Sequence, residues 1–355
     1  MVNEKYKKLD KFIKNSMKKC WRVPGISITI FNSNEILYKY VGGYSNLQTK
    51  SKLKITDKFC IASCSKSILC AAISSLIEKR KIPNIWNMTL EEVWSKNIHK
   101  DYKKVTVKKI ASHCSGIPGH INNDNCEKYY TKVQVKLNKI LDGMKSREKL
   151  ANLILKEEPS YPPGKSYDYS NWGYGILGAI IERLTKKNYS QIIEEEIMKP
   201  LKIDANYSLE YYFHGKNYVN GHYVDYDRDK NKKYIPLKKN EWLLNRHQSP
   251  SGKIWMSILD STKYCQSYLK TLKKEKSILK LSTIKYLTKP IINKYGYGWI
   301  NNNKNKLKRI FHSGTDYHTS TLFYLIPNKN IGIIICSNTE NNHSWSIIEE
   351  LLKTI

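Results

Sequence analysis

The sequence predicts an α+β protein in which helices flank one antiparallel sheet built from both ends of the chain. Strand patterns rich in apolar and β-branched residues open the 355-residue chain, helical periodicity fills its middle, and strand patterns return near its end. The first two strand patterns, residues 26–31 and 36–41, flank a short turn and therefore predict an antiparallel hairpin. The economical arrangement of these elements is a single sheet with a mainly helical insertion between its two halves.

The first part of the chain divides at its glycines and prolines. We expect an amphipathic helix over residues 4–20, because Pro24-Gly25 follows it and would stop it. Gly42-Gly43 is expected to end the second strand. After the strand-like FCIAS, apolar residues recur at 68, 69, 72, 73, 76 and 77, which predicts a helix that ends before Pro83.

The remaining elements follow from the same two periodicities. Further helices are expected near residues 89–97, 107–113, 147–157, 171–186, 189–199, 257–272 and 277–287. Residues 200–250 are rich in Tyr and irregular, with short strands around 218–224. The segments YGYGWI, RIFHS, STLFYLI and IGIIICSN predict four strands, Asn301–Lys306 reads as a hairpin loop, and a helix over 343–353 closes the chain.

These elements predict how the chain divides. We expect an N-terminal helix in residues 1–23 and one main domain in residues 24–353. The sheet part covers about 24–80 and 257–355, and the mainly helical insertion covers about 81–256.

The formal net charge is +30, from 61 basic and 31 acidic residues. Such a charge is compatible with an anionic partner such as nucleic acid or a membrane surface. The lysines, however, are scattered from Lys5 to Lys353, and Lys, Asn, Ile and Tyr are abundant throughout, as an AT-rich genome would produce. We therefore expect no specific nucleic-acid partner, and the sequence leaves the oligomeric state open.

The eight cysteines form no Cys-x-x-Cys pair, and no His cluster has zinc spacing. The N-terminus, MVNEKYKKLDKF, lacks the apolar region of a secretory signal, and the longest apolar runs are too short to cross a bilayer. We expect a cytoplasmic protein with reduced thiols, no membrane association, and no metal or organic cofactor.

Ser63-x-x-Lys66 is the first candidate for catalytic chemistry, although the same spacing occurs at seven places in the chain. Only this copy opens a strongly apolar helix directly after a strand-like segment. A serine there lies near free N–H groups and the positive end of the helix dipole. Lys66 is one turn further on the same face, and desolvation would lower its pKa and make it a proton acceptor. The alternative is a helix-capping serine followed by a solvated lysine.

Two further motifs carry polar groups suited to the same chemistry. Tyr169 and Asn171 stand at i and i+2 before an apolar helix, so in extended backbone they point the same way. A phenol beside a lysine ammonium can serve as a base, and an asparagine can donate to a substrate carbonyl; ordinary turn and capping chemistry is the alternative. His312-Ser313-Gly314-Thr315 follows near the C-terminus, where Gly314 permits close approach to a strand edge and the Thr315 N–H can join an oxyanion hole. The alternative is a β-bulge with a surface histidine.

The order Ser-x-x-Lys, Tyr-x-Asn, His-x-Gly resembles the serine β-lactamase and penicillin-binding-protein superfamily, within it the class C β-lactamase and D-Ala-D-Ala carboxypeptidase group. Residues 105–118, VTVKKIASHCSGIP, are similar to the family's His-Thr-Ser-Gly-Leu-Pro segment. The Pro-Gly-containing segment that leads into the Tyr-Ser-Asn helices and the closing strands are similar as well. The resemblance extends over roughly residues 24–353.

The resemblance implies a β-lactamase/transpeptidase-like fold with Ser63 as nucleophile and Lys66 as its hydrogen-bonded partner. Tyr169 would be the general base and then the acid, Asn171 would position the substrate, and Thr315 would supply the second oxyanion N–H. His312 stands where many members have a lysine that favours the substrate carboxylate, and we expect it to titrate near its ordinary pKa of about 6.5 and to bind carboxylates better below that pH. We therefore expect a serine hydrolase that acts through an acyl-enzyme on a small amide, ester or peptide. A true β-lactamase and a non-hydrolytic binding or scaffold protein are the alternatives.

Overall fold

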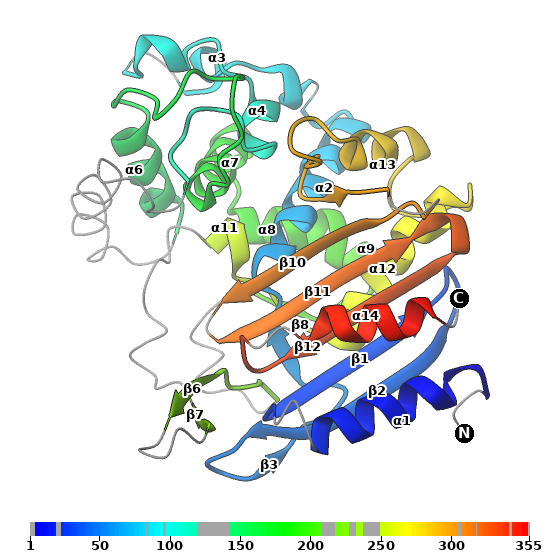
Figure 1. The fold of residues 1–355 in the computed structure, drawn as a ribbon. Helices are drawn as coiled ribbons and strands as arrows, with labels where there is room; N and C mark the ends of the chain where they lie inside the picture. Colours follow the sequence, from blue (N-terminus) through cyan, green and yellow to red (C-terminus); the bar gives the residue numbers. More distant parts are fainter. Residues whose placement is uncertain are drawn as a thin grey trace.

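A seven-stranded antiparallel sheet forms the centre of the computed structural model, with strand order β3-β2-β1-β12-β11-β10-β9 (Figure 1). The structure describes residues 4–18, 23–82, 84–94, 97–119, 143–207, 217–226, 232–236, 249–303, 307–316, 318–340 and 343–353. The strands are β1 (Gly25–Phe31), β2 (Ile36–Asn46), β3 (Ser51–Lys52), β9 (Ile300–Asn301), β10 (Ile310–Asp316), β11 (Thr319–Ile326) and β12 (Ile331–Ser337). The predicted sheet built from both chain ends is confirmed, since β1 pairs with β2 on one side and with β12 on the other.

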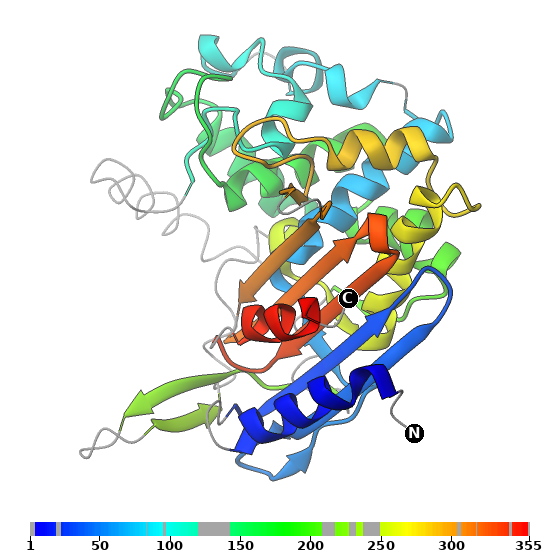
Figure 2. The same ribbon diagram turned by 45° about the vertical axis from the view of Figure 1, so that its right-hand side comes forward.

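Helices cover both faces of this sheet, which explains why β1, β11 and β12 are buried along their whole lengths. On one face, α1 (Lys7–Ser16) and α14 (Ser344–Leu352) pack on apolar side chains that include Ile28 and Ile335, which pair across β1 and β12 (Figure 2). On the other face lies α12 (Ile258–Leu272), and the hydroxyl groups of Thr29 and Thr262 are 2.8 Å apart there. This second face is continuous with the core of the helical part.

Two strand predictions were wrong, and glycine accounts for both. β2 does not end at Gly42-Gly43 but continues to Asn46, because Gly43, with φ of +89°, lets the chain bend while Tyr44 N–H still donates to Pro24 O at 2.7 Å. Of YGYGWI, only Ile300 lies in a strand. Gly298, with φ of +74°, turns the chain against the backbone of Ser67, where a Cβ would come within 2.5 Å of the Ser67 Cα.

The segment between the sheet halves is mainly helical. Its helices are η4 (Ile85–Asn87), α3 (Leu90–Trp94), η5 (Lys100–Tyr102), α4 (Val107–Ala111), α6 (Met144–Ile154), α7 (Asn171–Thr185), α8 (Tyr189–Ile193), the π-helix η6 (Glu194–Met198), α9 (Lys199–Leu201) and α11 (Ser249–Gly252). A buried ion pair of Arg147 with Glu182, at 2.6 Å, joins α6 to α7. The helix expected over 189–199 is present as α8, η6 and α9, which follow one another without a gap. Its π-helical part carries Glu196, which pairs with Lys79 at 2.7 Å.

Short strands connect the two parts. β4 (Lys58–Cys60), β8 (Trp255–Ser257) and β5 (Ala205–Asn206) form a three-stranded sheet in the order β4-β8-β5. β6 (His222–Tyr226) and β7 (Lys232–Pro236) form a separate hairpin, near the predicted strands. The remaining elements are η1 (Glu4–Tyr6), η3 (Ala62–Cys64), α2 (Ser65–Glu78), α13 (Leu281–Thr288) and η9 (Pro327–Lys329). The predicted domain limits near 81 and 256 stay a prediction.

Three expectations fall partly or wholly outside the described residues: the last turn of the helix over 4–20, most of 200–250, and the end of the Asn301–Lys306 loop. Within the described part of the chain, no helix combines the length and apolar character needed to cross a bilayer.

Candidate active site

Ser63 lies in the 3-10 turn η3, between β4 and the first turn of α2. Its side chain is partly exposed, whereas Ala62, Cys64 and Ser65 are fully buried. Ala62 has a φ of +46°, a value that a residue with a Cβ adopts only under strain. The capping position of α2 belongs to Cys64 and carries no side-chain cap. The alternative interpretation of Ser63 as the cap of this helix is therefore wrong.

Lys66 is fully buried and makes three short polar contacts. Its Nζ lies 2.9 Å from Ser63 Oγ, 2.8 Å from Asn171 Oδ1 and 2.7 Å from the carbonyl oxygen of Ser251. Burial lowers the pKa of Lys66 to about 7, although the negative charge of Asp316 acts in the opposite direction. A large fraction of Lys66 is therefore a neutral amine near neutral pH.

The three contacts determine what a neutral Lys66 can do. A neutral amine has two N–H groups and one lone pair. Asn171 Oδ1 and Ser251 O can only accept hydrogen bonds, so they take both N–H groups. In this neutral form the lone pair remains for Ser63, 2.9 Å away, and the Ser63 hydroxyl can donate to it. This arrangement aims a proton acceptor at the candidate nucleophile.

Tyr169 lies just before α7, and its side chain is hydrogen-bonded to Ser63. Burial raises the pKa of Tyr169 above its usual value, and its hydrogen bond with Ser63 only partly offsets this. The expectation that Lys66 makes this phenol easier to deprotonate is wrong, because desolvation of the phenolate outweighs the cation, whose Nζ is 4.8 Å from the ring centroid. Tyr169 keeps its proton and is suited to donate it.

Asn171 is the first residue of α7, and its position agrees with the predicted i, i+2 geometry. Both Asn171 and Tyr169 reach the Ser63–Lys66 pair. Ser170, between them, caps α7 by accepting from Gly173 N–H at 2.9 Å, and its hydroxyl donates to Pro118 O at 2.6 Å. Ser170, and not Asn171, is therefore the N-cap residue of α7.

The third motif lies on β10. A Cβ on Gly314 would come within 2.5 Å of the Ser63 backbone N and 2.7 Å of Ile61 O, so only glycine lets this strand approach the nucleophile so closely. Thr315 follows on the exposed side of the strand. Its role as the second oxyanion N–H donor stays a prediction.

His312 does not behave as the sequence suggested. It is 3% exposed, and its two ring nitrogens contact Tyr295 Oη at 3.0 Å and the Ser313 carbonyl at 2.6 Å. A carbonyl only accepts, so Nδ1 carries the proton and Nε2 accepts from Tyr295. Burial, with a smaller effect of the Lys66 charge, lowers the pKa of His312 to about 3. The expected titration near pH 6.5 is wrong, and His312 is neutral.

Sequence reasoning missed two groups that complete this site. Ser251 contributes a main-chain carbonyl, which leaves no signal in the choice of side chain. Lys253, 5% exposed, forms an ion pair with Asp316 at 2.6 Å, two residues after Gly314.

The six cysteines in the described segments are buried and free: Cys60, Cys64, Cys70, Cys114, Cys265 and Cys336. Cys64 Sγ donates to His312 O at 3.2 Å. No group of three His, Cys, Asp or Glu side chains suited to a metal occurs in those segments.

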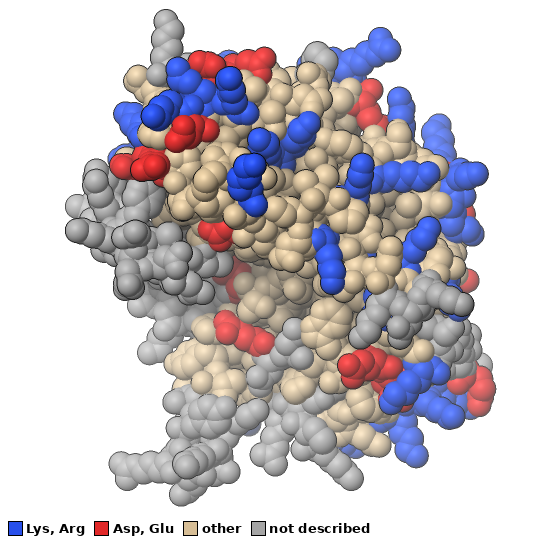
Figure 3. All heavy atoms as spheres, turned by 45° about the horizontal axis from the view of Figure 1, so that its top comes forward, with Lys and Arg blue, Asp and Glu red and all other residues tan. Residues whose placement is uncertain are grey.

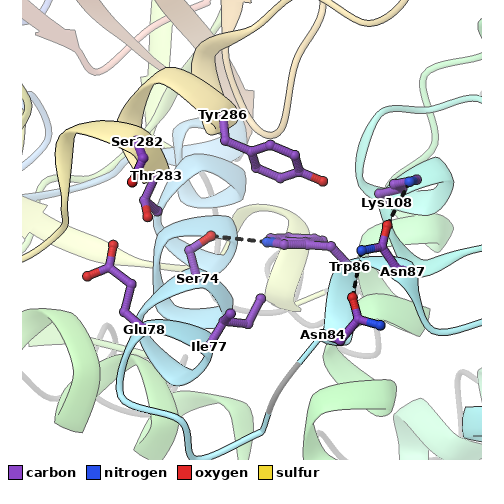
Figure 4. A pocket seen from close by; sticks show the side chains of 10 residues that line it. All are labelled: Ser74, Ile77, Glu78, Asn84, Trp86, Asn87, Lys108, Ser282, Thr283 and Tyr286. Atoms are coloured by element: carbon purple, nitrogen blue, oxygen red, sulfur yellow. Dashed lines mark hydrogen bonds between the residues drawn. The ribbon is translucent and has the colours of Figure 1, made fainter.

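A separate cavity of about 420 Å³ lies between η4, the second half of α2 and α13. Figure 4 shows Trp86 below Tyr286, with Glu78 and Lys108 on opposite sides. The Trp86 N–H donates to Ser74 Oγ at 3.2 Å. None of the predicted site residues lines this cavity, so it is distinct from the Ser63 site.

On the face in Figure 3, the Lys and Arg side chains of the described residues do not gather into one compact patch. Lys and Arg are spread there among acidic and uncharged residues. This distribution agrees with the scatter of lysines along the sequence.

Comparison with known proteins identifies the family of this chain. The family model described as Beta-lactamase matches residues 9–350. The chain belongs to the Beta-lactamase family. Protein flp from Staphylococcus aureus (strain MW2) is 27% identical over 357 residues, which cover 99% of this chain and 66% of that protein. The chain thus spans about two thirds of the length of this relative.

Solved structures show the same fold. An octameric penicillin-binding protein homologue from Pyrococcus abyssi matches with a TM-score of 0.77 and 23% identity, over 97% of this chain and 77% of that one. EstCE1, described as a hydrolase with promiscuous acyltransferase activity, matches with a TM-score of 0.76 and 15% identity, over 99% and 98%. The predicted family and its β-lactamase/transpeptidase-like fold are confirmed.

Proposed function

We propose that this chain is a serine hydrolase that transfers the acyl group of a small amide, ester or peptide to Ser63 and then to water. The observation that carries the proposal is the environment of Lys66. A buried amine with a pKa of about 7, whose N–H groups are bound by Asn171 and Ser251, presents its lone pair to the Ser63 hydroxyl.

In acylation, Ser63 Oγ attacks the substrate carbonyl while its proton passes to Lys66 Nζ. The tetrahedral oxyanion is held by the backbone N–H of Ser63 and that of Thr315. The bond to the leaving group then breaks, and the leaving atom takes the proton of Tyr169, whose pKa burial keeps above its usual value. Lys66 passes its extra proton to the Tyr169 phenolate, which restores both groups.

Deacylation repeats these roles, with water as the nucleophile and Ser63 as the leaving group. Water attacks the acyl carbonyl and gives a proton to Lys66, while Tyr169 protonates Ser63 Oγ as it leaves. Proton transfer from Lys66 to Tyr169 again closes the cycle, and the product is the free acid. Asn171 acts here by orienting the amine through its 2.8 Å hydrogen bond.

The charges around Ser63 favour uncharged acyl groups. His312 is neutral and bound through both ring nitrogens, and Lys253 is paired with Asp316. A carboxylate-bearing β-lactam would therefore meet no unopposed cation among these three side chains. This observation favours an esterase or amidase over a true β-lactamase. EstCE1, with its acyltransferase activity, is a precedent for such chemistry on the same fold.

Active-site labelling tests the proposal and its non-hydrolytic alternative. The purified protein is treated in parallel with a fluorophosphonate and a fluorescent penicillin, and the adduct is mapped by peptide mass spectrometry. Modification of Ser63 by the fluorophosphonate, absent in Ser63→Ala and retained in Ser51→Ala, supports an activated nucleophile. Labelling by neither reagent would favour a binding or scaffold protein that retains the fold.

A further inference from the structure

His113 lies just after α4 and holds the backbone on both sides of Tyr169. Its carbonyl oxygen accepts from the N–H of Asp168 at 2.9 Å. Its ring Nδ1 accepts from the N–H of Ser170 at 3.0 Å. The residue is 1% exposed and has a φ of +59°, a left-handed conformation that brings the carbonyl and the ring to the same segment.

The His113 ring also supports Tyr169 by direct packing. The centroids of the two rings are 4.4 Å apart. On its other sides His113 contacts Tyr295, at 4.7 Å, and Tyr174, at 5.2 Å. Tyr295 in turn binds His312. His113 is thus at the centre of an aromatic cluster that lies behind the phenol of the candidate acid.

The hydrogen bonds define the protonation state of His113. Because Nδ1 accepts from Ser170, the proton of the neutral ring is on Nε2. Nε2 is buried and has no hydrogen-bond partner among the described residues. Burial lowers the pKa of His113 well below its usual value, and the Lys66 charge acts in the same direction. A buried ring N–H without a hydrogen-bond partner costs free energy, so a contribution of His113 to the fold or the reaction is expected to offset it.

We propose that His113 is a positioning residue that holds the Tyr169 phenol within reach of Ser63 and the departing group. This inference rests on the proposed function, because it assigns His113 a role only through Tyr169. His113 touches neither the nucleophile nor Lys66 in any contact described above. Its loss would let Tyr169 shift away from the line between Ser63 and the leaving atom. A misplacement of about 1 Å can lower a rate by roughly 10²-fold.

Leaving groups of different basicity separate positioning from general stability. A p-nitrophenolate leaves without needing a proton, whereas an alkoxide such as ethoxide needs the acid. We expect His113→Ala to lower kcat/KM for an ethyl ester by about 10–100-fold and that for the matching p-nitrophenyl ester by much less. His113→Asn should recover most of the loss, because its amide oxygen can accept from Ser170 N–H and asparagine tolerates a positive φ.

His222 supplies the matched control. Like His113, it is buried and one of its ring nitrogens accepts a hydrogen bond from a backbone N–H. In His222 this nitrogen is Nε2, and the donor is Leu47 N–H at 3.2 Å. His222→Ala should leave the ratio of kcat/KM for the two esters unchanged. If His113→Ala does not fold, His113→Gln replaces it, since the longer side chain carries its amide beyond the Nδ1 position. Equal losses for both esters in the His113 variant would overturn the inference.

Double mutants separate this inference from the proposed function. In a Tyr169→Phe background, His113→Ala should add little, because the group that it positions is already missing. If the Tyr169→Phe variant hydrolyses the ethyl ester slowly but the His113→Ala variant keeps the wild-type ratio of kcat/KM for the two esters, only the role of His113 is overturned. A Tyr169→Phe with wild-type rates on the ethyl ester would overturn the acid role of Tyr169 and the positioning role with it.

Discussion

The segment that leads from η3 into α2 and the last turns of α12 carry the same Ser-x-x-Lys pattern in different environments. At Ser63-x-x-Lys66, the lysine is fully buried and its amine contacts the serine hydroxyl at 2.9 Å. At Ser267-x-x-Lys270, the serine is buried and donates to the carbonyl of Tyr264 at 2.6 Å, while Lys270 is partly exposed. The comparison teaches that spacing places the two side chains on one helix face, and that tertiary burial makes them reactive.

The largest expected difference between the two copies is in turnover. Ser63→Ala should abolish hydrolysis of p-nitrophenyl butyrate, because the attacking oxygen is removed. Ser267→Ala should change kcat/KM by less than about twofold, since the Ser267 hydroxyl only donates to a carbonyl of its own helix. Comparable losses in the two variants, measured as steady-state rates, would show that context does not distinguish these copies.

Removal of the amine extends the comparison to the lysines. Lys66→Met keeps the length and apolar stem of the side chain but has no proton acceptor. We expect a loss of about 10²–10⁴-fold in kcat/KM, the usual range for a general base. Lys270→Met is the control and should retain full activity. Because the variant leaves the Asn171 and Ser251 acceptors without their donor, its melting temperature should be measured beside its rate.

Tyr169→Phe tests the group that completes the pair at α2 and has no counterpart at α12. The ring is kept and the donated proton is lost. We expect kcat/KM for an ethyl ester to fall by about 10²–10⁴-fold, with a smaller loss for a p-nitrophenyl ester. An unchanged rate for the ethyl ester would contradict the assignment of Tyr169 as acid.

The smallest expected effect concerns His312. Its pKa of about 3, caused by burial, keeps it neutral throughout the working range, so no positive charge develops as the pH falls. The ratio of kcat/KM for nitrocefin to that for p-nitrophenyl butyrate should therefore stay constant between about pH 5 and pH 8. A ratio that rises as the solution is acidified would show that His312 becomes charged and attracts the carboxylate.

Much of the fold could be predicted because strands and helices differ in period. The apolar run of 26–31 and the 3.6-residue repeat after Ser67 identify their elements directly. Gly43 and Gly298 were harder, because a glycine can end a strand, bend it or admit a neighbouring backbone, and only the packing decides.

The site was predictable in its members and less so in its electrostatics. The motif order predicted that Ser63, Lys66, Tyr169 and Asn171 share one site, and these four side chains contact one another in the structure. Ser251 could not be foreseen because it acts through a carbonyl oxygen. The pKa values of Tyr169 and His312 were misjudged because desolvation depends on every element packed around a group, which a linear motif does not contain.

The most direct test of the account is the pH dependence of kcat/KM for p-nitrophenyl butyrate in the unmodified protein. Burial lowers the pKa of Lys66 to about 7, and only its neutral form can accept the Ser63 proton. The value of kcat/KM should therefore rise with pH, bend at about pH 7, and fall roughly tenfold per pH unit well below that point. A profile that is flat from about pH 5 to pH 8, or that keeps rising toward the ordinary lysine pKa near 10.4, would contradict a neutral Lys66 as the base.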